Sequence, residues 1–127
     1  MNTITYGKFD TKNVAPITTD LDGWQPVEGS PSMKTWIEYA AENGKLLSGF
    51  WEAQPGTYAV TYNADEVVHI FEGEAVLTDK DGQSVTYKAG DSFVVKAGFS
   101  GTWKTIKTIR KIFTIDLPED VTAPFGG

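Results

Sequence analysis

The sequence predicts an all-β, single-domain barrel with an extended N-terminal arm. Three observations support this fold class: about eight or nine short β-like segments, turn signals every 8 to 12 residues or so, and no convincing long helix. The strand pattern is densest between Gly56 and Gly101. A chain of 127 residues matches one ordinary domain that can bury a core without disulfides. The chain also lacks a parallel βαβ unit and a phosphate-binding glycine loop.

Residues 1–32 are predicted to form an extended arm. They are rich in Thr, Asp, Pro and Gly, and they contain few periodic apolar positions. Trp24 is the expected anchor that ties this arm to a surface, either on its own barrel or on a partner subunit. The barrel is then expected to span 33–117, with a frayed tail at 118–127.

The segment from Met33 to Ala41 is compatible with a helix or a strand. It contains good helix formers, and Asn43-Gly44 could cap a helix. However, Asn-Gly between two apolar stretches is a strong β-hairpin signal, and the flanking aromatic and aliphatic residues suit strands. We therefore expect a hairpin.

The central strands follow from alternation and turn chemistry. Tyr58, Val60 and Tyr62 share one face of the segment "TYAVTY". The run 66–71 is apolar on both faces apart from Glu66 and His69, which predicts a strand covered on both sides and ended by Gly73.

The remaining strands are expected in the second half of the barrel. Asp81-Gly82 predicts a tight hairpin between 75–78 and 84–87. Further strands are expected at 92–95, after Gly90-Asp91, and at 102–116, where β-branched residues occupy nearly every second position.

Composition narrows the function classes. The absence of Cys excludes disulfides and thiolate chemistry and fits the cytoplasm. The net charge of -6 opposes nucleic-acid binding, and the four basic residues of 104–111 are interpreted as a solvated strand edge: Lys104, Lys107, Arg110 and Lys111. The N-terminus shows no signal-like apolar run, and no stretch approaches the ~18 apolar residues of a membrane span. We therefore expect no membrane partner.

Several spaced motifs resemble those of the cupin superfamily. The chain contains "EVVHIFEG", then Gly90-Asp91 followed by an apolar strand, then "KAGFSGTW". Glu66 is followed by six residues and then Gly73, as in the first cupin motif, and Gly90 and Gly98 match glycines of the second. The resemblance implies a double-stranded β-helix, the RmlC-like jelly-roll barrel. From about Trp24 to Ile115, the chain looks like the small cupins related to ureidoglycine aminohydrolase and the ethanolamine-utilisation cupin.

The chain departs from the cupin pattern at the metal ligands. The His-x-His register of the first motif falls on Val60 and Tyr62, and the second-motif histidine would fall near Gly101, which leaves Glu66 alone. No cofactor is therefore predicted, although a hard divalent cation held by oxygen ligands of Glu52, Asp65 and Glu66 is left open. Glu66 and His69 are the remaining ligand candidates, but on an uninterrupted strand they point to opposite faces.

The predicted site centres on Glu66. Strand parity places Val68 and Ile70 beside it, and the other expected pocket residues are Trp51, Val60 and Trp103. Desolvation in such a pocket suits the carboxyl for general acid–base work, with the Tyr62 hydroxyl orienting it. Alternatively, Glu66 only accepts hydrogen bonds from a neighbouring strand or a basic side chain, with Lys111 among the candidates.

Three functions remain open from the sequence. The first is a cupin that binds a small polar metabolite in the barrel without the usual metal. The second is an enzyme that acts on a ureido, amide or hydroxy-acid compound through Glu66, as the resemblance implies. The third is a structural or dimerising module. Exposed sheet edges and the apolar anchors of the arm predict a homodimer.

Overall fold

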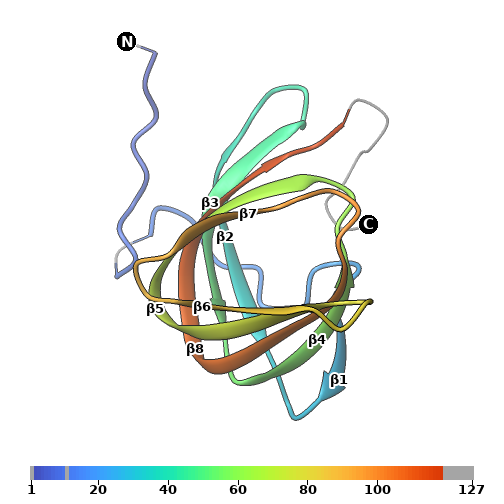
Figure 1. The fold of residues 1–127 in the computed structure, drawn as a ribbon. Helices are drawn as coiled ribbons and strands as arrows, with labels where there is room; N and C mark the ends of the chain where they lie inside the picture. The colour runs from blue at the N-terminus through green and yellow to red at the C-terminus, as the bar shows by residue number, and fades with distance from the viewer. Residues whose placement is uncertain (1, 11, 119–127) are drawn as a thin grey trace.

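The computed structural model describes residues 2–10 and 12–118, in which eight strands form one antiparallel sheet that curls into a barrel (Figure 1). The strands are β1 (Gln25–Glu28), β2 (Met33–Ala40), β3 (Leu46–Ala53), β4 (Gly56–Thr61), β5 (Asp65–Asp79), β6 (Ser84–Lys88), β7 (Ser92–Val95) and β8 (Ser100–Asp116). The all-β, single-domain prediction is confirmed. No helix in these residues is long and apolar enough to cross a membrane.

The two longest strands organise the barrel. β5 and β8 pair antiparallel from Asp65 opposite Asp116 to Asp79 opposite Gly101. The other edge of β5 pairs with β7 in its first half and with β6 in its second half. The other edge of β8 pairs with β3 and β4, which carry β2 and β1 in turn. Both edges of β5 and β8 are therefore paired, and the inward-facing side chains of these two strands line the core.

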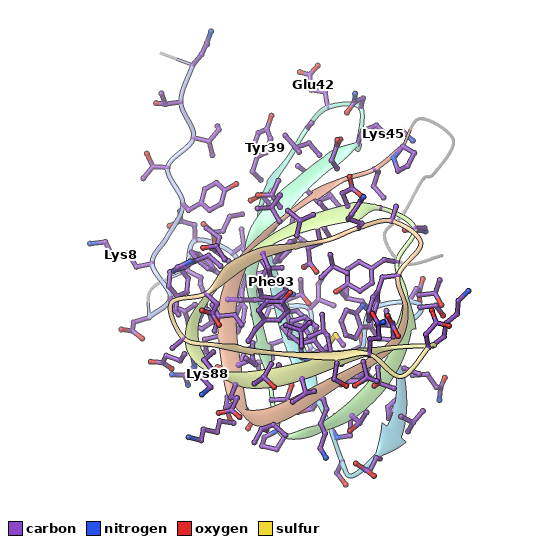
Figure 2. The ribbon with its side chains drawn as sticks, viewed as in Figure 1. Lys8, Tyr39, Glu42, Lys45, Lys88 and Phe93 are labelled. Carbon is purple, nitrogen blue, oxygen red and sulfur yellow. The ribbon has the colours of Figure 1, made fainter. Side chains whose placement is uncertain are left out.

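The ambiguous segment 33–41 is a strand, as expected. β2 and β3 form the hairpin that the Asn43-Gly44 turn predicts, and Gly44 adopts a φ of +71°, a conformation that a glycine takes without steric cost. Figure 2 shows the tip of this hairpin, with Glu42 and Lys45, projecting away from the barrel. The hairpins and strands expected at 75–87, 92–95 and 102–116 are also present.

Gly73 does not end its strand, which corrects the sequence prediction. β5 continues through it to Asp79, with register shifts between Ile70 and Ala75. Gly73 has a φ of +100°, and a Cβ at this position would collide with the carbonyl oxygen of Thr108. This glycine therefore bends a continuous strand around the barrel, as glycines at bulges do.

The expectation that both faces of the strand at 66–71 are covered is also wrong. Glu66, Val68 and Ile70 are buried, whereas Val67 and Phe71 on the outer face are 54% and 44% exposed. The alternation is thus that of a strand with one face in the core.

The arm contributes to the barrel directly. Within 1–32, β1 pairs with β4, Ile17 forms a bridge to Thr35, and Trp24 lies in the core. Nearer the N-terminus, Phe9 packs edge-on against Trp36 on the outer surface, and the chain then extends away (Figure 1). Of the tail predicted at 118–127, residues 119–127 lie outside the described residues.

Candidate functional site

Glu66 lies inside the barrel near the start of β5. Its backbone is flanked by Val95 of β7 and Ile115 of β8, so its side chain starts from the middle of the sheet. Tyr62 reaches the same space because β4 ends at Thr61 and a short turn leads into β5. Two backbone hydrogen bonds, from Tyr62 N to Phe99 O and from Gly98 N to Tyr62 O, hold Tyr62 in place.

Three polar side chains form a buried chain of hydrogen bonds. The Tyr62 hydroxyl donates to Glu66 Oε1 at 2.8 Å, and Lys111 Nζ donates to Glu66 Oε2 at 2.8 Å. The side chains of Lys111 and Glu66 are only 1% and 3% exposed. Each carboxylate oxygen thus has a donor, and a complete ion pair sits in the core of the barrel.

Aromatic rings surround this ion pair. Lys111 Nζ lies 4.4 Å from the ring centroid of Trp51 and 4.6 Å from that of Trp103, within cation–π range. Hydrogen bonds from Trp51 Nε1 to Met33 Sδ and from Trp103 Nε1 to Thr105 Oγ1 fix both rings. We call Glu66, Lys111, Trp51, Trp103 and Trp24 the tryptophan box.

Trp24 closes the box from the arm. Its ring lies 5.4 Å from Trp51 and 6.0 Å from Trp103 between centroids, and its side chain is 5% exposed. The cavity left beside Glu66 and Lys111, which Leu21 and Trp24 help to line, is about 10 Å³. That volume is close to the minimum for one water molecule. The box is therefore closed while the arm is seated.

A second cavity, open to solvent, lies on the side of β6 and β7. It is about 300 Å³ in volume, and its lining includes Leu77, Tyr87, Val95, Lys96 and Phe99. The Phe99 ring packs edge-on against Tyr62 at 5.8 Å, so Phe99 stands between this cavity and the hydroxyl that contacts Glu66. Figure 2 shows side chains crowding the space inside the ribbon, with Phe93 near its centre in this view.

Burial changes the acid–base behaviour of the site. Desolvation raises the pKa of Tyr62 well above its ordinary value of 10.0, and the negative charge of Glu66 adds to this rise. Desolvation lowers the pKa of Lys111, while the neighbouring Glu66 opposes the change. Tyr62 thus stays a neutral hydrogen-bond donor at physiological pH.

The raised pKa of Tyr62 predicts a loss of stability in alkali. Because its folded pKa lies above the unfolded value, the contribution of Tyr62 is complete below pH 10.0 and declines as the pH rises past it. Tyr58, whose hydroxyl donates to Asp20, also has a raised pKa, mainly through desolvation. Ultraviolet titration should show Tyr58 and Tyr62 ionising at a higher pH than free tyrosine, and Tyr62→Phe should lose one of these two delayed ionisations. Ionisation of Tyr62 at the pH of free tyrosine would contradict this assignment.

The structure gathers most of the predicted site residues in one core. Trp51, Val60, Val68, Ile70 and Trp103 are all buried in it with Tyr62. Trp51 and Trp103 contact Lys111, whereas Val68 and Ile70 continue the inner face of β5 beyond Glu66.

Lys111 and Trp24 are the site residues that the sequence prediction did not choose. The interpretation of the basic cluster as a solvated strand edge is wrong, because β8 is paired on both sides and Lys111 is buried; only the exposure of Lys104 and Lys107 agrees with it. The available signal was parity, since Lys111 shares its face of β8 with Ile109 and Phe113. Trp24 was expected only to anchor the arm.

His69 does not belong to this site. It lies on the outer face of β5, opposite to Glu66, and its Nδ1 is 2.7 Å from Ser92 Oγ. Its ring packs edge-on against the exposed Phe71.

The residues inside the barrel do not fit a cupin metal site. Val60 and Tyr62 replace the two first-motif histidines, and a side chain at Gly101 would collide with the carbonyl oxygen of Thr78. Within the described ranges, no three His, Cys, Asp or Glu side chains come together as a metal-binding group. Moreover, the Lys111 ammonium already occupies the neighbourhood of Glu66, where it would repel a second cation.

Each carboxylate considered as a ligand for a hard cation already accepts a hydrogen bond from a different group of the protein. Glu52 accepts from Arg110 Nε at 2.9 Å, and Asp65 accepts from the backbone of Ala97 at 2.8 Å. Glu66 is held by Lys111, so these three carboxylates do not converge on one cation.

Comparison with known proteins places this geometry among related folds. A family model described as the EutQ-like cupin domain matches residues 40–113, more than half of the chain. The EutQ protein of Clostridium difficile is 22% identical over 72% of this chain and 72% of its own, with a TM-score of 0.64. A putative ethanolamine utilization protein Q from Salmonella typhimurium is 22% identical over 78% of this chain and 77% of its own, with a TM-score of 0.62.

A third solved structure is longer than this chain. It is a protein of unknown function of the DUF861 family from Pseudomonas syringae pv. tomato, 20% identical over 80% of this chain, with a TM-score of 0.68. The match covers 43% of that protein, so the chain spans less than half of its length. A search of curated protein sequences found no match.

Proposed function

The chain belongs to the family of EutQ-like cupin domains, and we propose that it binds a small polar metabolite inside its barrel without a resident metal. The family membership confirms the cupin resemblance of the sequence. It does not identify a ligand, so the proposal rests on the chemistry of the tryptophan box.

The observation that carries the proposal is the fully buried ion pair of Glu66 and Lys111. Burying two charges costs several kcal/mol per ion, and apolar residues of similar volume often stabilise a core equally well or better. A charged pair in an aromatic cavity is therefore poor evidence for stability and good evidence for a functional site. Its complementary charges suit a ligand that has both donors and acceptors.

The box offers a specific recognition pattern. Glu66 accepts hydrogen bonds, Tyr62 and Lys111 donate them, and the Trp51 and Trp103 rings provide flat apolar walls. A small planar compound with a carbonyl group and an adjacent donor matches this pattern. Because the box is closed, the ligand enters by displacing Trp24 or by rotating Phe99 from the open cavity.

The same contacts favour an enzymatic form of the proposal. A bound amide, ureido or hydroxy-acid compound would lie against Glu66, which can act as general base or acid, while Lys111 polarises its carbonyl oxygen. In this form of the proposal the protein also converts the bound compound. Incubation of the protein with each compound that binds, followed by analysis for products, would detect the conversion.

A ligand screen with matched variants tests the proposal. Thermal unfolding is followed with small amides, ureido compounds, hydroxy acids and sugars for the wild type and Glu66→Gln. We expect at least one compound to raise the Tm of the wild type, since a ligand at 100 times its Kd stabilises the folded state by about 2.7 kcal/mol. The shift should vanish in Glu66→Gln.

Glu72→Gln is the matched control for the screen. Glu72 lies on the same strand and also pairs with a basic residue, Arg110, but its side chain is 59% exposed. The ligand shift should persist in this variant. An equal shift in the wild type and Glu66→Gln would remove Glu66 from the site, and no shift with any compound would favour a structural module.

A further inference from the structure

Lys111 combines three features of an amine that reacts with carbonyl compounds. It is buried in an aromatic cavity, its Nζ lies 2.8 Å from a carboxylate, and a neutral hydroxyl donates to the same carboxylate. Amines activated by desolvation in apolar pockets form Schiff bases. We propose that Lys111 forms a Schiff base with a small aldehyde or ketone in the tryptophan box, an inference that rests on the proposed function and names its ligand class.

The neighbouring groups supply the proton transfers that the reaction needs. Lys111 gives one proton to Glu66 and becomes a neutral amine. Its nitrogen forms a bond to the carbonyl carbon, the C=O π electrons move to oxygen, and the nitrogen loses a second proton as that oxygen is protonated through Glu66 and Tyr62. The carbinolamine then loses water: the nitrogen lone pair forms the C=N bond, and the C–O bond breaks as the oxygen takes the proton from Glu66.

The balance of the reaction closes without an oxidant or a reductant. The ammonium of Lys111 and one carbonyl compound give one iminium ion and one water. The Lys111 nitrogen carries the positive charge both before the reaction, as an ammonium, and after it, as an iminium. It therefore keeps its partners: the Glu66 carboxylate and the faces of Trp51 and Trp103.

The buried surroundings of Lys111 favour its neutral amine, which is the form that reacts with a carbonyl group, more than water favours the neutral amine of an exposed lysine. Burial lowers the pKa of Lys111, whereas Lys104 on the same strand has a side chain that is 51% exposed. The existing cavity of about 10 Å³ holds one water molecule at most, so a carbonyl compound reaches Lys111 when Trp24 or Phe99 moves aside. A small compound requires the least displacement.

Reductive trapping tests the proposal. Hydroxyacetone and cyanoborohydride are added to the full chain at neutral pH, and adducts are located by peptide mass mapping. We expect one adduct on Lys111, formed faster than any adduct on the exposed Lys104, because the amine in the apolar pocket is the more readily activated one. Lys111→Arg should lose this adduct and Lys104→Arg should retain it. Trp24→Ala, which keeps Lys111 but opens the box, should form it faster.

The outcomes separate this proposal from the one on which it rests. Adducts spread over exposed lysines, with none on Lys111 in the wild type or Trp24→Ala, would overturn Schiff-base formation. The diol 1,2-propanediol resembles hydroxyacetone but cannot form an imine. A Glu66-dependent thermal shift with the diol or any compound of the screen, without an adduct on Lys111, would leave the binding site intact and exclude only the covalent step. Failure of both measurements would overturn both proposals.

Discussion

Lys111→Met is expected to destabilise the protein by about 3–5 kcal/mol, because it leaves the buried carboxylate of Glu66 without its countercharge. Methionine roughly preserves the length and volume of the side chain, so the loss reports the charge and not a cavity. Urea unfolding of the wild type and the variant, with equal m-values, measures the effect.

Lys104→Met is the matched control for this substitution. Lys104 lies on the same strand, and its Nζ is 3.9 Å from Glu28 Oε1, but both side chains are mostly exposed. Exposed pairs contribute little, so this variant should unfold close to the wild type. If Lys111→Met lowers the free energy of unfolding no more than Lys104→Met does, Glu66 is not held as a buried anion.

Trp24→Ala is expected to cause the second large effect, a destabilisation of about 3–5 kcal/mol. Trp24 contacts four aromatic residues of the core: Trp51, Tyr58, Tyr62 and Trp103. Its removal leaves a cavity next to the ion pair, and the opened box should let acrylamide quench the fluorescence of Trp51 and Trp103 more strongly. Urea unfolding and quenching are measured on the same samples.

Val27→Ala tests whether the effect belongs to Trp24 or to the arm as a whole. Val27 lies in β1, three residues later, and is 56% exposed. It should change neither stability nor quenching appreciably. If Trp24→Ala behaves like Val27→Ala, the arm does not close the barrel.

The strands were predictable because their signals are local. Alternation in 57–62 and the Asn43-Gly44 and Asp81-Gly82 turns each involve neighbouring residues, and each element is present. The extension of β5 through Gly73 was missed because a glycine marks a strand end and a strand bend equally well. Only the crowding by Thr108, which is distant in sequence, distinguishes the two.

The site was predictable in part, for the same physical reason. Parity along β5 places Glu66 with Val68 and Ile70 in the core and His69 outside, and the structure has this arrangement. The pairing of Glu66 with Lys111 depends on which strands become neighbours across 45 residues. Parity with Ile109 and Phe113 hints that Lys111 faces the core, but only the pairing of β5 with β8 shows that it meets Glu66.

The role of Trp24 could not be read from the sequence either. The arm lacks regular alternation, and the sequence left open whether it packs on its own barrel or on a partner. Contacts such as the hydrogen bond from Tyr58 to Asp20 show that it closes its own core. The predicted homodimer stays a prediction.

The most direct test of the account uses a variant in which Tyr62→Phe, Glu66→Leu and Lys111→Met are combined, so that the polar chain becomes apolar. Replacement of a whole buried ion pair is often neutral or stabilising by about 1–4 kcal/mol. The measurement is the ligand-induced rise in Tm of this triple variant, with the compound that stabilises the wild type. We expect a folded protein at least as stable as the wild type that has lost the ligand shift. A stable triple variant that retains the full shift would contradict the claim that the buried polar chain is the binding site.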